Sequence, residues 1–86
     1  MASYRVEVSK TAEKQIVSLP RVDQVRVVRV IAKLANDPRP DGSRKLAGYD
    51  STFRVRVGSY RIIYDIDDHR VIVVILKVGH RRDVYR

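Results

Sequence analysis

FRVRVGSYRIIY, residues 53–64, is the stretch of the sequence that decides the fold. Apolar and basic side chains alternate before Gly58-Ser59, and a similar alternation of apolar and polar side chains follows it. A period of two is typical of a half-buried β-strand. Gly58-Ser59 fits a two-residue type II′ turn, in which glycine takes the first central position. We therefore predict an antiparallel hairpin of two strands, over residues 53–57 and 60–66.

The chain before this hairpin carries signals for one strand and two helices. Residues 4–8 alternate between apolar and polar side chains, which predicts a short half-buried strand. Ser9 then stands at the N-cap position of a helix that Pro20 ends, and Pro20 is suited to the first turn of the next helix. This second helix is predicted over residues 21–36.

The second helix has a broad apolar arc when its residues are placed at about 100° intervals. The arc contains Val25, Val27, Val28, Val30, Ile31, Ala32, Leu34 and Ala35. An arc of this width is typical of a helix that contacts both a sheet and a neighbouring helix. Arg26, Arg29 and Lys33 lie on the outer side, which we expect to be a solvated face.

The remaining segments complete an α+β pattern. Pro38, Pro40 and Gly42 predict a loop, and residues 71–78 predict a strand that Gly79 ends. Because residues 71–78 are apolar on both phases, we place that strand centrally in the sheet. The predicted fold is an N-terminal strand and a two-helix hairpin packed on a largely antiparallel four-stranded sheet (β-α-α-β-β-β), with a short C-terminal tail. The place of the first strand in the sheet does not follow from the sequence.

Size and composition narrow the class of protein. Eighty-six residues are too few for two cores, so we expect one domain spanning residues 1–86. Eighteen Lys and Arg against ten Asp and Glu give a net charge of +8, and thirteen of the eighteen cations are Arg, which favours bidentate recognition of phosphate or carboxylate. The absence of Cys excludes disulfide scaffolds and thiolate metal sites. The longest apolar run has six residues, far short of the ~20 that cross a bilayer, and no apolar signal segment opens the chain. We expect a cytoplasmic protein without a membrane partner, which binds a polyanion.

Three arginines share one face of the predicted hairpin. A two-residue turn places Arg56 opposite Arg61, and Arg54 lies two residues from Arg56 on the same face. Like charges that face each other across a ladder destabilise it by about 0.2–1 kcal/mol, which a bound anion would offset. Asp65 lies on the Arg61 face and is able to pair with one of them. The alternative is that Arg54 and Arg56 are only the solvent side of an amphipathic strand.

The C-terminal tail, VGHRRDVYR at residues 78–86, is the second basic feature. It is either a frayed end or a segment that docks through Val84 and Tyr85. No metal site is indicated, because the chain has two His and no Cys and its only Glu residues are Glu7 and Glu13. What remains is a cluster of Arg with a Tyr and a His, suited to phosphodiester chemistry. RNA cleavage needs a base for the 2′-hydroxyl, an acid for the 5′-oxygen and stabilisation of the transition state, and preorganised Arg supplies the last.

These residues resemble the RelE branch of the RelE/ParE toxins of type II toxin–antitoxin modules. The similarity covers nearly the whole chain, and its specific parts are residues 53–64 and Val78-Gly79-His80-Arg81. The resemblance implies a ribosome-dependent endoribonuclease that cleaves mRNA in the A site of the 70S ribosome, through contacts with rRNA and mRNA. It also implies a RelB-like antitoxin as partner, and no metal or other cofactor.

The resemblance also implies roles for residues at matching positions. Tyr85, or Arg54 with Arg56, assists deprotonation of the 2′-hydroxyl. Arg61 stabilises the transition-state phosphate, and Arg81 is the acid or a further stabiliser. Other members of the family often have Lys at positions 54 and 56. Because Arg holds its proton more firmly than Lys, the base role is shifted towards Tyr85.

The role of His80 and the target of the protein are left open. His80 stands where some relatives have Lys and others have a His that can serve as an acid. One alternative function is that of a ParE-like inhibitor of DNA gyrase on the same fold, which fold analogy does not separate from a ribonuclease. A second alternative is a non-catalytic RNA-binding module, although the chain offers little aromatic stacking surface.

Overall fold

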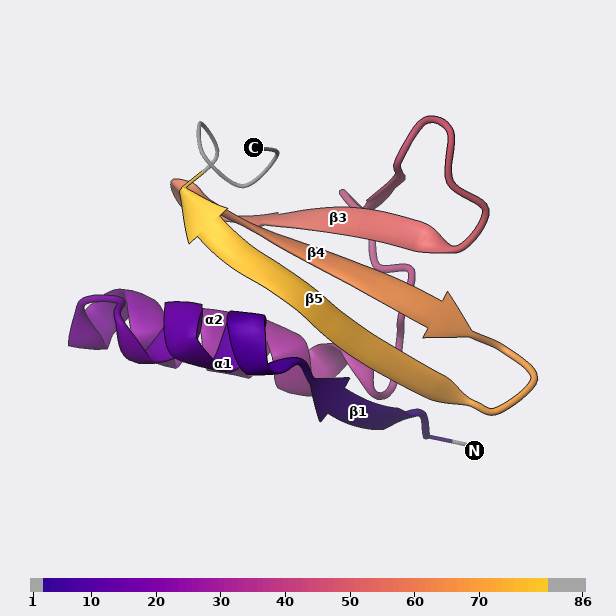
Figure 1. Cartoon of the computed structure of the whole chain (residues 1–86), viewed down its shortest axis with the longest axis horizontal. Helices are drawn as coiled ribbons and strands as arrows, with labels where there is room; N and C mark the ends of the chain where they lie inside the picture. The colour runs from indigo at the N-terminus through magenta and orange to yellow at the C-terminus, as the bar shows by residue number, and fades with distance from the viewer. Residues whose placement is uncertain (1–2, 81–86) are drawn as a thin grey trace.

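The computed structural model describes residues 3–80, which form a sheet with two helices on one face (Figure 1). The elements are β1 (Arg5–Val8), α1 (Lys10–Val17), α2 (Arg21–Leu34), β2 (Arg44–Lys45), β3 (Thr52–Val57), β4 (Tyr60–Asp67) and β5 (Ile72–His80). Within these residues the sheet has five strands in the order β1-β5-β4-β3-β2. Only the β1–β5 pair is parallel. The predicted α+β class and the largely antiparallel sheet are therefore confirmed.

The sheet has one strand more than the four that were predicted. The additional strand is β2, which consists of Arg44 and Lys45 and pairs with β3 at the edge of the sheet. Two residues are too few to show a period of two, so the sequence indicated only a loop in this region. The first strand, whose place was open, lies at the other edge beside β5. Strand β5 therefore has a neighbour on each side, as its two apolar phases predicted.

Ser9 joins α1 to the sheet. Its Oγ accepts a hydrogen bond from the backbone N–H of Ala12 at 3.0 Å, which confirms the predicted N-cap. The same hydroxyl donates to the backbone carbonyl of Leu76 in β5 at 2.9 Å. The helix ends earlier than expected, at Val17, and Pro20 is the N-cap of α2 and not part of its first turn.

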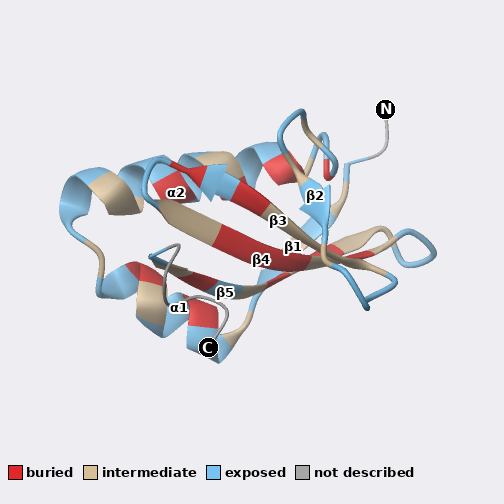
Figure 2. Cartoon of the chain, turned by 90° about the horizontal axis from the view of Figure 1, so that it is seen from above, coloured by how far each residue is buried: buried red, intermediate tan, exposed pale blue. Residues whose placement is uncertain are grey.

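The core lies between the two helices and the sheet (Figure 2). Its largest fully buried side chains are Tyr64, Leu34, Ile62, Ile75, Val27, Val73 and Val78. The buried side of α2 is narrower than the predicted arc, because Val25 and Val28 are 41% and 50% exposed. Val25 and Val28 line a groove along α2 to which α1 contributes no residue.

Strand β5 contains a bulge, and its bounds differ from the predicted residues 71–78. A bulge between β4 and β5 interrupts the alternation, so that Ile75 and Val78 are both buried although they are three residues apart. At the strand's start, Val71 belongs to the turn with φ of 58°, and at its end the strand continues through Gly79 to His80.

Among residues 3–80, neither helix is long and apolar enough to cross a membrane.

Candidate functional site

The hairpin of β3 and β4 has the predicted register. Val57 pairs with Tyr60 and Arg56 pairs with Arg61 across the two-residue turn. Gly58 has φ of 59°, as the first central position of a type II′ turn requires. Arg56 and Arg61 are therefore cross-strand neighbours, as the sequence indicated.

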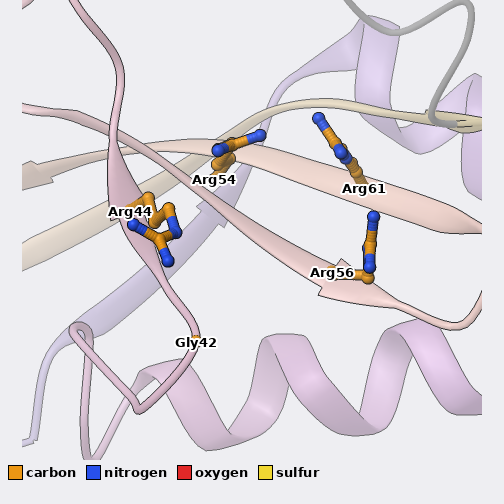
Figure 3. A pocket seen from close by; sticks show the side chains of 5 residues that line it. All are labelled: Gly42, Arg44, Arg54, Arg56 and Arg61. Carbon is orange, nitrogen blue, oxygen red and sulfur yellow. The ribbon is translucent and has the colours of Figure 1, made fainter.

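Four arginines line one cavity of about 350 Å³ on the face of the sheet that carries Arg56 and Arg61 (Figure 3). We call it the arginine cavity; its described lining residues are Gly42, Arg44, Arg54, Arg56 and Arg61. They come from β2, β3, β4 and the loop before β2, and none of them is acidic. The structure thus brings together the three arginines that the sequence predicted for this hairpin.

Arg44 is the residue that sequence reasoning missed. It pairs with Arg54 in the β2–β3 ladder, so the sheet carries a second cross-strand pair of arginines beside Arg56 and Arg61. The only sequence signal was the adjacent Arg44-Lys45 after Gly42, which gives no strand register. Like charges that face each other across a ladder are destabilising by about 0.2–1 kcal/mol, and an anion in the cavity would offset that repulsion. Two such pairs around one cavity therefore indicate an anion-binding site.

Asp65, the acidic residue expected near the arginines, contacts two hydroxyls. Its Oδ1 accepts hydrogen bonds from Ser51 Oγ at 2.7 Å and from Thr52 Oγ1 at 3.0 Å. These bonds join β4 to the start of β3, at the end of the hairpin opposite to its turn. Asp65 therefore contributes to holding the two strands that carry the arginines.

An exposed ionic network holds the loop before β2. Arg39 donates to Asp68 through both terminal nitrogens, at 2.8 and 3.3 Å, and Tyr4 donates to the same carboxylate at 2.7 Å. The hydrogen bonds from Arg39 and Tyr4 lower the pKa of Asp68, and the bond to Asp68 raises the pKa of Tyr4. The Arg39 guanidinium also lies 5.2 Å from the centre of the Phe53 ring. The network thus joins the loop, the β4–β5 turn and the N-terminal segment.

Two tyrosines of β4 serve structural roles. The buried Tyr64 hydroxyl donates to the carbonyl of Pro38 at 2.8 Å, and burial raises the pKa of this side chain. Tyr60 donates to Asp23 of α2 at 3.1 Å, and that hydrogen bond raises the pKa of Tyr60. A raised pKa disfavours the phenolate, so neither hydroxyl is suited to be a base.

The end of β5 lies beside the start of β4. Gly79 pairs with Arg61, and His80 pairs with Tyr60, with the two rings edge to face at 6.0 Å. Because cross-strand partners share a face, the exposed His80 ring lies with Tyr60 on the helix side of the sheet, whereas Arg61, which pairs with Gly79, faces the other side.

The two other predicted site residues, Arg81 and Tyr85, lie outside the described residues. Within residues 3–80, no three or more His, Cys, Asp or Glu side chains are grouped as a metal site would require.

Comparisons with known proteins place this α+β fold among toxins of type II toxin–antitoxin systems. Residues 6–85 match the family model described as the ParE toxin of the type II toxin–antitoxin system parDE. Toxin RelG of Mycobacterium tuberculosis is 40% identical over 87 residues, covering 96% of this chain and 97% of that protein. The putative toxin RelE1 of Methanocaldococcus jannaschii is 30% identical and covers 96% of both chains.

Solved structures agree with these sequence relationships. The RelE–RelB complex of Pyrococcus horikoshii contains a chain with a TM-score of 0.83 and 30% identity, covering 95% of this chain and 99% of that one. The RelBE2 toxin–antitoxin complex of M. tuberculosis gives a TM-score of 0.82 at 34% identity, covering 93% of this chain and 100% of that one. The protein is the toxin of a type II toxin–antitoxin system. It belongs to the RelE/ParE family.

Proposed function

We propose that this toxin is a ribosome-dependent endoribonuclease that cleaves mRNA in the ribosomal A site. The observation that carries the proposal is the arginine cavity, where two cross-strand pairs of like charge surround a space with no acidic residue among its described lining. A phosphodiester in this cavity would offset the repulsion in both pairs. The relatives named RelE and RelG support the same class of toxin.

The proposed reaction is an attack of the 2′-hydroxyl on the adjacent phosphorus. The O2′–P bond forms while the P–O5′ bond breaks, which leaves a 2′,3′-cyclic phosphate and a free 5′-hydroxyl. Arg61 stabilises the negative charge that develops on the phosphoryl oxygens, and Arg54 and Arg56 bind the same group from the neighbouring strand. In phosphoryl transfer, one well-placed arginine contributes a factor of about 10³–10⁵ to the rate.

Proton transfer is assigned to the residues that follow the sheet. A guanidinium holds its proton too firmly to be an efficient base, so Tyr85 is the proposed base. Its phenolate would be stabilised by neighbouring cations. Arg81 stabilises or protonates the leaving O5′; His80, the other candidate for this acid, is the last residue of β5 and packs against Tyr60 on the helix side of the sheet, which favours Arg81. Residues on the strands thus bind and stabilise, while those after β5 move protons.

The proposed partners are the 70S ribosome, through rRNA and mRNA, and a RelB-like antitoxin. The antitoxin is supported by the M. tuberculosis and P. horikoshii relatives, whose structures are complexes of toxin with antitoxin. A ribosomal target places the activity in the cytoplasm.

Induction of the toxin without its antitoxin tests this function. We expect arrested translation and new 5′ ends within ribosome-bound mRNA, mapped by sequencing. Arg61→Gln should lower cleavage by about 10³-fold or more. Lys14→Gln, which removes one exposed positive charge from α1, is the matched control and should cleave as the wild type does. Circular dichroism of both variants checks that they are folded.

The same experiment separates the alternatives. DNA breaks and an SOS response with intact mRNA would identify a gyrase inhibitor and contradict the proposal. Ribosome binding without any cleavage by the wild-type protein would indicate a non-catalytic RNA-binding module.

A further inference from the structure

A second basic cavity lies between α2 and the turn of the β3–β4 hairpin. Its volume is also about 350 Å³, and its lining includes Arg26, Arg29 and Lys33 of α2 together with Arg56 and Gly58 of the hairpin. We call it the helix cavity. The α2 residues were expected to form a solvated face, but the hairpin turn makes this part of the surface concave.

The position of Arg26 in the helix cavity depends on the turn. A Cβ atom at position 58 would lie 3.2 Å from both terminal guanidinium nitrogens of Arg26, which is closer than ordinary van der Waals contact. Glycine at position 58 therefore does two things: it adopts the positive φ of the turn, and it leaves room for the guanidinium against the backbone. The turn thus brings a cation of α2 next to the hairpin that carries Arg56.

The cations of the helix cavity are not neutralised within the described part of the chain. The three ion pairs there join Arg5 with Glu7, Arg39 with Asp68 and Arg70 with Asp67. None of them involves a cation of the helix cavity. The lining thus concentrates four positive charges, with no acidic residue among its described members. Such a site attracts a polyanion whose charges are also closely spaced.

Arg56 connects the two cavities, because it lines both of them. Cations therefore follow one another from β2 and β4, across β3, to the outer side of α2. Resting on the proposed function, we propose that the helix cavity binds the phosphate backbone of the same RNA strand whose scissile phosphate lies in the arginine cavity. An acidic peptide would also be attracted to these cations. The two cavities are continuous through Arg56, however, which favours a nucleic acid strand, because it carries a negative charge on every nucleotide.

The proposal is tested by the salt dependence of RNA binding. The probe is a single-stranded 2′-O-methyl RNA oligonucleotide, which lacks the attacking hydroxyl and therefore is not cleaved. We compare the wild type with the double variant Arg29→Gln/Lys33→Gln. Each phosphate contact on a single strand contributes about 0.7 to the slope of log K against log salt, so losing two contacts should reduce the slope by about 1.4.

A matched variant controls for net charge. Lys10→Gln/Lys14→Gln removes two exposed charges from α1, which lines neither cavity, and its slope should stay near that of the wild type. A dinucleotide probe has a single phosphate, which the arginine cavity would hold, so it should not distinguish the Arg29→Gln/Lys33→Gln variant from the control.

An acidic peptide is measured as a second ligand. Three outcomes would overturn the proposal: equal slopes for the two double variants, no salt-dependent RNA binding by the wild type, or an Arg29→Gln/Lys33→Gln variant that loses binding to the peptide but not to RNA. Cleavage is not part of this measurement. If the proposed ribonuclease activity fails, the slopes still report whether the helix cavity binds RNA.

Discussion

Replacing Arg56 by Gln should stabilise the free protein while weakening its binding of RNA. Arg56 is exposed, so its removal leaves no cavity in the core. It faces Arg61 across the ladder, and Arg54 is its neighbour on the same strand and the same face. Gln preserves the length and polarity of the side chain, so the main change is the loss of repulsion between like charges.

The register sets the size of this effect. Relief of one directly opposed like-charged pair is worth about 0.2–1 kcal/mol in the free energy of unfolding. For a domain of this size, 1 kcal/mol shifts Tm by about 4–8 °C, so the expected rise in Tm is about 1–8 °C. RNA binding should change in the opposite direction, because both cavities lose a shared cation.

The assay is thermal and urea unfolding at low and high salt. The Debye length falls from about 10 Å at 0.1 M salt to about 3 Å at 1 M, so the advantage of Arg56→Gln should largely disappear at 1 M. Lys77→Gln is the control, because Lys77 is an exposed cation of the same sheet that faces Ile63 and no like charge. Added inorganic phosphate should stabilise the wild type more than Arg56→Gln, because only a ligand of the folded state shifts its unfolding.

Two results would refute this reasoning. Arg56→Gln could prove less stable than the wild type at low salt, which would mean that the arginines support the sheet. A gain of the same size for Lys77→Gln would show that net charge alone, and not the opposed pair, is responsible.

Three further substitutions test the frame around the site. Tyr64→Phe should cost about 1–3 kcal/mol in urea unfolding, since it leaves the carbonyl of Pro38 without its donor, and an unchanged midpoint would contradict this. Asp68→Asn should lower Tm at neutral pH. The difference in Tm between the wild type and this variant should shrink as the pH falls from about 4 through the pKa of Asp68, which Arg39 lowers, because Arg39 stabilises only the ionised carboxylate. A difference in Tm that stays constant in acid would exclude this linkage. Gly58→Ala should cost about 1–3 kcal/mol in thermal unfolding through its positive φ, and an unchanged Tm would rule out the assigned turn.

The hairpin could be predicted from the sequence because its turn has only two residues. Once Gly58-Ser59 is the turn, every pairing in β3 and β4 follows, including Arg56 with Arg61. Strand β2 could not be predicted in the same way, since two residues define neither a period nor a partner, and Arg44 was missed with it. The position of a short edge strand depends on the contacts that hold its loop, which are made by residues distant in the sequence.

The outer side of α2 shows a second limit of sequence reasoning. The period of a helix separates a buried from an exposed side, but it does not say whether the exposed side is flat or concave. Val25 and Val28 are more exposed than their place in the apolar arc predicted, because they line a groove to which α1 contributes no residue. Arg29 and Lys33 line a cavity because a turn some twenty-five residues later in the sequence lies next to them. Both results depend on which elements are neighbours in the folded chain.

The positive charges of the site are held in place by the pairing of the strands that carry them. The two-residue turn sets the ladder of the strands that carry Arg54, Arg56 and Arg61. The repulsion among these side chains is therefore overcome when the protein folds. Such preorganisation lets charges act on a transition state without rearrangement at the moment of reaction. Arg44 depends in addition on its loop, which the Arg39–Asp68 ion pair and the Tyr64–Pro38 hydrogen bond join to the sheet. The strands can thus supply fixed positive charge but no efficient base, which is why we assign proton transfer to the residues that follow β5.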